Sequence, residues 1–155
     1  MTTSSGRSAF LHRASIPEYV ELLSARGADA NARDNEVKTP LMTVGSSRVA
    51  ELLIRKGAAV NARSVNGSTA LILHRGPDIV RVLLENGADV NLRNNDGVTA
   101  LIAAVRGKDP LGAEFLIARG ADVNAVTKDG ETPMKIAARE VEIGIGELLR
   151  QAGAR

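Results

Sequence analysis

A short block of residues returns along almost the whole of this 155-residue chain, and this repetition limits its possible folds more than any other feature. The block is Gly-Ala followed, three residues further on, by Asn, and the fifth copy has only its first two residues. The copies begin at Gly27, Gly57, Gly87, Gly120 and Gly153, with spacings of 30, 30, 33 and 33 residues. Periods of this size are typical of proteins that stack one small unit many times.

Helix-start and helix-stop signals fit the same period. A threonine stands 12 residues after each of the first four repeat glycines, and Pro40 and Pro133 directly follow such a threonine. Pro17, Pro77 and Pro110 each lie ten residues before a repeat glycine. Proline is tolerated in the first turn of a helix, and glycine suits the left-handed residue that ends one. The sequence therefore predicts two helices per unit, with every proline at a helix start.

The unit resembles the ankyrin repeat, which reads roughly D-x-x-G-x-T-P-L-H-x-A-A, then an outer helix, then G-A-D-V-N. The resemblance covers about residues 4–155, which we divide into units 1 to 5 as 4–33, 34–63, 64–93, 94–126 and 127–155. It implies one all-α domain, an ankyrin-repeat solenoid of stacked helix-turn-helix units with β-hairpin finger loops. We expect Asn66-Gly67, Asp96-Gly97 and Asp129-Gly130 to form tight turns at the finger tips.

Two departures from the regular repeat have structural consequences. Units 2 and 3 lack three residues between the threonine and the repeat glycine, and unit 1 is shortened by two or three. The loss falls at the end of the inner helix and removes nearly one turn, so we expect a thinner N-terminal half. Gly144 and Gly146 lie in the last outer helix, so we expect that end to fray first.

The composition excludes several kinds of chemistry. Cysteine is absent, and His12 and His74 lie two units apart, so we expect no metal site, no catalytic residue and no cofactor. Ser8 and His12 lack an acid that would orient the imidazole. The net charge is only +2, the basic residues alternate with acids, and aromatics are few, which does not favour nucleic-acid binding. No apolar run reaches membrane-span length, and we expect a cytoplasmic monomer.

The resemblance implies that a partner protein binds the concave side, which finger tips and inner helices form. The candidate contacts are the residues at matching positions of units 2 to 5. On the fingers they are Asn35, Glu36, Lys38, Val65, Asn66, Ser68, Asn95, Asp96, Val98, Lys128, Asp129 and Glu131. On or near the inner helices they are Met42, Thr43, His74, Arg75, Arg106 and Lys108.

Three further candidates form a series that the repeat does not require. Arg33, Arg63 and Arg93 occupy the same finger position in successive units, and Val126 ends the series. Packed helical layers lie roughly 8–10 Å apart, so these guanidiniums are expected to form a ladder on one face. One interpretation is that the ladder binds an acidic stripe on the partner. The other is that each arginine pairs with a nearby aspartate or is solvated.

Other functions remain open at the level of sequence. A regulatory inhibitor that occludes a partner enzyme's active site is one, because the shortened inner helix near residues 45–53 is similar to one unit of small ankyrin-type kinase inhibitors. The excess of 15 Arg over 5 Lys is typical of GC-rich bacterial genomes, in which ankyrin proteins serve as accessory, immunity or effector proteins. An enzyme with an unfamiliar site would show several convergent titratable groups in a pocket.

Overall fold

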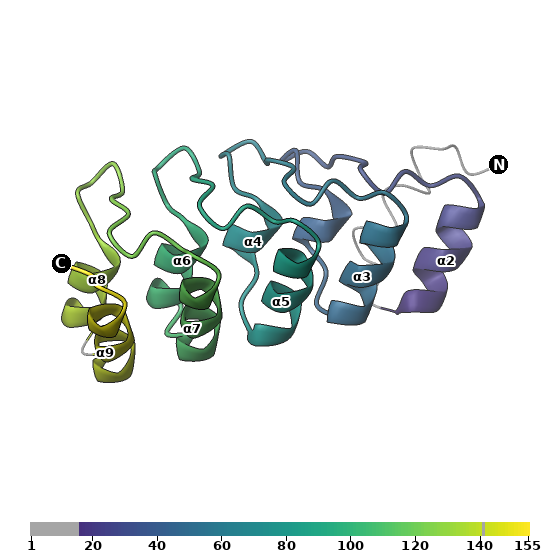
Figure 1. Cartoon of the computed structure of the whole chain (residues 1–155). Helices are drawn as coiled ribbons and strands as arrows, with labels where there is room; N and C mark the ends of the chain where they lie inside the picture. The colour runs from purple at the N-terminus through teal and green to yellow at the C-terminus, as the bar shows by residue number, and fades with distance from the viewer. Residues whose placement is uncertain (1–15, 141) are drawn as a thin grey trace.

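The structure, a computed structural model, describes residues 16–140 and 142–155, in which pairs of short helices stand side by side in one row (Figure 1). The outer helices are α2 (Pro17–Ala25), α3 (Ser47–Arg55), α5 (Pro77–Glu85), α7 (Pro110–Ala118) and α9 (Ile143–Gln151). The inner helices are the 3-10 turn η1 (Pro40–Met42), α4 (Ala70–Leu73), α6 (Ala100–Arg106) and α8 (Pro133–Arg139). Ser8, His12 and the rest of the expected first inner helix lie outside the described residues.

Each of the five prolines begins a helix, as the sequence predicts. Pro17, Pro77 and Pro110 are the first residues of α2, α5 and α7, and Pro40 and Pro133 are the first residues of η1 and α8. The N–H of a first helical residue has no partner inside the helix, so proline removes nothing there. The repeat therefore places its helix starts by backbone chemistry that is local to each unit.

The residues that cap these helices behave differently in short and long inner helices. Before the long inner helices α6 and α8, Thr99 accepts a hydrogen bond from Ile102 N at 3.3 Å, and Thr132 accepts one from Lys135 N at 3.2 Å, as expected for N-caps. Thr39, which precedes Pro40 as Thr132 precedes Pro133, is buried, and its hydroxyl has no hydrogen-bond partner among the described residues. It does not cap the helix because η1 is a 3-10 turn, in which Met42 N already donates to the carbonyl of Thr39 at 3.0 Å.

The glycines that the repeat assigns to helix ends and finger tips all have positive φ. The five repeat glycines, which follow the outer helices, have φ between 80° and 90°. Gly67, Gly97 and Gly130 at the fingers have φ of 77°, 78° and 76°. A side chain is strained in this left-handed region, so glycine is required at these positions for conformational reasons.

The inner helices of the N-terminal half are shortened where the sequence predicts it. η1 has three residues and α4 has four, whereas α6 and α8 have seven each. The outer helices from α2 to α9 all have nine residues. The deletion therefore thins the inner layer of units 2 and 3 and leaves the outer layer unchanged, and Figure 1 shows the short α4 next to the longer α6.

The fingers are hydrogen-bonded loops, since the described ranges contain no β-strand. In each finger the N–H of one residue donates to the carbonyl four residues later, at 2.9 to 3.1 Å. The donors are Asp34, Ser64, Asn94 and Thr127. One such bond closes a loop without continuing into a ladder, so the β-hairpin form implied by the resemblance is not confirmed.

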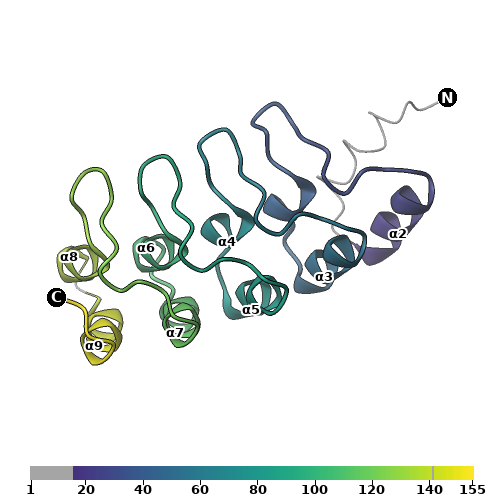
Figure 2. The same ribbon diagram turned by 45° about the horizontal axis from the view of Figure 1, so that its top comes forward.

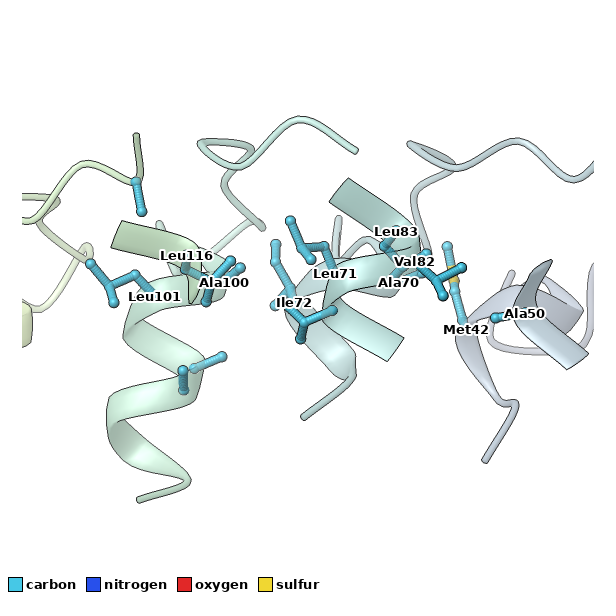
Figure 3. Packing of buried hydrophobic residues seen from close by; sticks show 14 of the residues in the cluster. Met42, Ala50, Ala70, Leu71, Ile72, Val82, Leu83, Ala100, Leu101 and Leu116 are labelled. Carbon is cyan, nitrogen blue, oxygen red and sulfur yellow. The ribbon is translucent and has the colours of Figure 1, made fainter. Parts of the chain in front are cut away.

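The core is a row of thin aliphatic layers between the helices. Leu71 and Leu83 in unit 3 and Leu101 and Leu116 in unit 4 are at most 2% exposed (Figure 3). Each layer packs on the next, so no large aromatic side chain is needed to fill a central core. This arrangement explains how a chain with few aromatics forms an ordered scaffold behind its fingers.

Candidate interaction surface

The three arginines at the ends of units 1 to 3 bind the backbone of the following unit. Arg33 Nη1 donates to the carbonyl oxygen of Arg63 at 3.0 Å, and the Arg63 guanidinium donates to the carbonyl of Arg93. Arg93 Nη1 donates to the carbonyl of Val126 at 3.0 Å, and its Nη2 lies 3.3 Å from Oδ2 of Asp122. This arginine ladder fastens each unit to the next, a role that neither interpretation of the sequence included.

A second ladder of side chains also connects consecutive units. Asn31, Asn61 and Asn91 each donate from Nδ2 to the carbonyl of the next repeat glycine, at 2.8 to 3.1 Å. The Oδ1 atom of each accepts a hydrogen bond from the backbone N–H two residues beyond that glycine, at 2.7 to 2.9 Å. These asparagines are therefore structural. An amide is suited to this position because it both donates and accepts.

Neighbouring finger tips are joined by single backbone hydrogen bonds. Val65 N donates to the carbonyl of Glu36 at 3.0 Å, and Asn95 N donates to that of Asn66 at 2.9 Å. The same bond between units 4 and 5 joins the N–H of Lys128 to the carbonyl of Asp96, also at 2.9 Å. The tips of units 2 to 5 therefore form a continuous row whose backbone is held in place. Side chains on this row are presented in a fixed order.

Three of the predicted contact residues lie in the core. Met42 is 5% exposed, Ser68 is 2% exposed and Val98 is 7% exposed. Met42 belongs to the single turn η1, which packs on α3 and α4, and the other two lie at the base of the fingers, where the chain turns into the next inner helix. Because these side chains are buried, they are not available to a partner.

His74 and Arg75 follow the short helix α4 and contact the units on either side. The ring Nε2 of His74 lies 2.7 Å from the carbonyl oxygen of Leu41 in unit 2. Burial lowers the pKa of His74, and the carbonyl of Leu41 opposes that shift only in part. Arg75 lies over Gly107 of unit 4, where an added Cβ would stand 2.2 Å from its Nε. His74 is thus half-buried, while Arg75 remains exposed.

Several charged candidates take part in ion pairs. Lys108 Nζ lies 3.2 Å from Oε1 of Glu142 and 3.8 Å from Oε2 of Glu140, both of the next unit. Arg139 Nη1 lies 2.8 Å from Oε2 of Glu131. Lys38 pairs with Glu36 on one finger, and its hydrogen bond to this carboxylate raises the pKa of Lys38. These exposed pairs contribute little stability each, and their charges remain within reach of a partner.

The remaining candidates form one exposed set, which we call the finger surface. Val65, at one finger tip, is 68% exposed, an unusual value for an apolar side chain in this chain. The exposed members are Asn35, Glu36, Thr43, Val65, Asn66, Arg75, Asn95, Asp96, Arg106, Lys108, Lys128 and Asp129. Lys38, His74 and Glu131 are half-buried at its edges.

The described residues show no arrangement suited to metal chemistry. No group of three or more His, Cys, Asp or Glu side chains within them comes together as metal ligands would. A hollow of about 310 Å³ lies between units 2 and 3, lined by residues 45–47 and 75–79. Its lining residues follow the short helices η1 and α4 in the chain, where the three-residue deletions lie. No helix in residues 16–140 and 142–155 is both long and apolar enough to cross a membrane.

Comparison with known families agrees with this architecture. A family model described as ankyrin repeats in three copies matches residues 8–94, and one described as ankyrin repeats in many copies matches residues 83–137. The chain therefore belongs to the ankyrin repeat family. Ankyrin repeats are in general protein–protein interaction modules and are typically non-catalytic. No curated protein matches the chain.

Proposed function

We propose that this protein binds a partner protein through the finger surface and does no chemistry itself. The observation that carries the proposal is the row of finger tips joined by backbone hydrogen bonds. Because the fingers are held in register before binding, little conformational entropy is lost when a partner docks. The tips combine an exposed apolar residue, Val65, with the charged residues Asp96 and Lys128, a mixture that suits a polar protein interface.

The arginine ladder favours an acidic stripe on that partner. Each guanidinium has five N–H donors, and the contact to the following carbonyl occupies only part of this set. The side chain of Arg93 is 45% exposed even while it pairs with Asp122. A carboxylate of the partner can therefore be bound by Arg33, Arg63 or Arg93 without breaking the contacts between units.

Quantitative capture of partners tests the proposed surface. The wild-type chain, immobilised on a resin, is compared with a triple variant at the tips, Val65→Ser, Asp96→Ser and Lys128→Ser. A matched triple variant on the outer helices, Glu51→Ser, Arg55→Ser and Glu147→Ser, is the control. We expect the tip variant to lose at least about 10-fold in affinity for the captured protein, as truncation of central contacts does. Equal losses in both variants would contradict the finger surface.

Salt dependence of binding tests the acidic stripe separately. We expect affinity for the captured partner to fall as ionic strength rises, because exposed charge pairs are screened. Replacing Arg33, Arg63 and Arg93 by Met is expected to weaken binding and to flatten this dependence. The thermal unfolding of the variant is recorded in parallel, since these residues also join units. An unchanged salt dependence in a folded variant would remove the stripe from the proposal.

A more specific alternative is that the protein is a regulatory inhibitor, which binds its partner through the same finger surface. If the captured partner is an enzyme, occlusion of its active site predicts loss of turnover when the chain is added, competitive with substrate. Undiminished turnover in the saturated complex would instead favour an accessory or targeting role.

A further inference from the structure

The outer helix α7 is apolar around most of its circumference, unlike the other outer helices that the structure describes. Among its nine residues, Pro110–Ala118, only Glu114 is charged. The outer helices α3 and α5 each carry three charged residues in the same length. A helix that is apolar all round is usually covered on all sides. Yet Leu111 is 59% exposed, which is one of the largest apolar exposures in the described chain.

The repeat does not require this leucine. Leu111 directly follows the first residue of its helix, and the equivalent positions in the preceding outer helices are Glu18, Arg48 and Asp78. Three charged residues at this position show that the solenoid leaves it in water. Unit 4 therefore departs from its own repeat towards an apolar surface, which the stacking of units does not explain.

The apolar residues form a strip beside a groove between α5 and α7, which are adjacent in the row of outer helices (Figure 2). Leu111, Phe115 and Ala118 follow one another at the i, i+4 and i+7 spacing of a single helix face. The groove has a volume of about 460 Å³ and is completed by Pro77, Arg81 and Glu114. The opposite face of α7, with Ala113 and Leu116, is the buried one.

The charges around the strip are arranged in a self-complementary way. The Arg81 guanidinium lies over the Phe115 ring, 5.1 Å from its centroid, and Glu114 is the exposed residue next to that ring in the chain. Within the described residues, neither Arg81 nor Glu114 has an opposite charge within 4.0 Å. Arg119, on the other side of the ring, is already within 4.0 Å of Glu85. Among the described residues, the same apolar strip is thus flanked by one cation and one anion that have no ion-pair partner.

We propose that a second copy of this chain covers the strip, with the two α7 helices antiparallel about a two-fold axis between residues 114 and 115. In this arrangement Leu111 of one copy faces the small Ala118 of the other. Glu114 of each copy then faces Phe115 of the other, over which Arg81 lies. A two-fold interface brings the same patch of both copies together, so a self-complementary patch satisfies both of its charges at once. The inference goes beyond the proposed function, because the strip lies on the outer helices and leaves the finger surface free.

The molar mass in solution tests the proposal directly. The strip spans one nine-residue helix, so we expect a weak dimer, with dissociation in the range of about 10 µM to 1 mM, as for small interfaces. Sedimentation across this range is expected to show a concentration-dependent shift from monomer to dimer. Leu111→Asp, which installs the type of residue that unit 3 has at this position, is expected to abolish the shift. A wild-type chain that stays monomeric throughout the range overturns the proposal.

Charge reversal gives a sharper test that does not depend on stability. Arg81→Glu alone and Glu114→Arg alone are each expected to weaken the dimer at least about 10-fold, because like charges then face each other. An equimolar mixture of the two variants is expected to associate again. In that mixture the unchanged Glu114 of one copy meets the unchanged Arg81 of the other, and the two introduced charges also meet. Failure of the mixture to associate overturns the paired geometry.

Glu51→Arg is the matched control for these variants. Glu51 is exposed and occupies on α3 the repeat position that Arg81 has on α5 and Glu114 has on α7. We expect it to leave the dissociation constant within about 2-fold of wild type, since it changes the net charge without touching the strip. A loss equal to that of Glu114→Arg would show that net charge, and not the strip, governs association.

Discussion

At the scale of single residues, one finger carries a residue that its backbone conformation does not favour. Val37 has φ of 59°, at the position where the other described fingers have Gly67, Gly97 and Gly130. A β-branched side chain in this region is unusual, and the strain is about 1–2 kcal/mol. The hydrogen bond from Val37 N to the carbonyl of Asp34, at 2.9 Å, keeps the turn closed despite this strain.

Replacing Val37 by glycine is therefore expected to stabilise the protein. We expect Val37→Gly to raise the free energy of unfolding by about 1 kcal/mol, less than the full strain because glycine also gains entropy in the unfolded chain. Urea denaturation monitored by circular dichroism measures the change. Gly130→Val is the reverse control, since an added Cβ there meets nothing within 4 Å and introduces strain alone. A destabilised Val37→Gly variant would contradict the argument.

His74 makes stability depend on pH. Its folded-state pKa is lowered from the ordinary 6.5 because burial disfavours the charged ring. The unfolded chain therefore takes up this proton more readily, and acid favours unfolding. We expect the free energy of unfolding to decrease as the pH falls through 6.5. The contribution of His74 to this decrease ends once the pH is below its folded-state pKa. His74→Gln, which keeps a donor for Leu41, is expected to flatten the dependence in urea denaturation at pH 7.5 and 5.5.

At the scale of single elements, the last outer helix is built from poor helix-forming residues. α9 contains Gly144 and Gly146, and an added Cβ at either meets nothing within 4 Å. Glycine inside a helix lowers stability relative to alanine by about 1 kcal/mol, because it loses more backbone entropy on folding. α9 has one neighbouring outer helix, α7, whereas the helices between α2 and α9 have two. The C-terminal unit is accordingly expected to open first.

Alanine at these two glycines is expected to remove that weakness. We expect Gly144→Ala and Gly146→Ala each to add about 1 kcal/mol and to increase the amide protection of α9 measured by hydrogen exchange. Gly112→Ala in α7 is the contrasting variant. Its Cβ would stand 2.2 Å from Oδ2 of Asp109, so this change is expected to destabilise. The explanation would be contradicted if Gly112→Ala stabilised the protein. It would also be contradicted if neither α9 variant did, since helix propensity would then not determine stability at these positions.

At the scale of the whole molecule, cooperativity depends on side chains that cross from unit to unit. Asn61 joins units 2 and 3 through Gly87 and Asp89, with both hydrogen bonds at 2.9 Å. In a solenoid the total stability is a sum over units and their interfaces, so a weakened interface lets the two sides unfold separately. The asparagine and arginine ladders are therefore the connections that make the row behave as one molecule.

Removing one member of the asparagine ladder tests this coupling. We expect Asn61→Ala to lower the free energy of unfolding by about 1–3 kcal/mol, as loss of two hydrogen-bond partners does, and to broaden the urea transition. Asn124→Ala is the matched control, because the contact found for its side chain is one hydrogen bond, from Arg155 N at 2.9 Å. A transition that is equally steep in both variants would contradict a coupling role for Asn61.

The helix starts could be predicted from the sequence and the exposed surface could not, for one physical reason. Pro77 starts α5 and Gly87 ends it because the first N–H of a helix and a left-handed residue are conditions of the local backbone. The three-residue deletions likewise shorten η1 and α4 through local connectivity. Whether Met42 or Ser68 reaches solvent depends on how the neighbouring units pack. The spacing of residues along the sequence does not show that packing.

The sequence by itself determined the family, the placing of prolines and glycines and the thin inner layer of units 2 and 3. Only the tertiary structure decided what the side chains at repeated positions contact. It placed Arg33 on the carbonyl of Arg63, the next unit's equivalent residue, and His74 on that of Leu41. It also left the apolar strip of α7 in solvent. The contacts of Arg33 and His74 join residues about 30 positions apart in the sequence. They arise only when the units stack and bring distant segments within hydrogen-bonding distance.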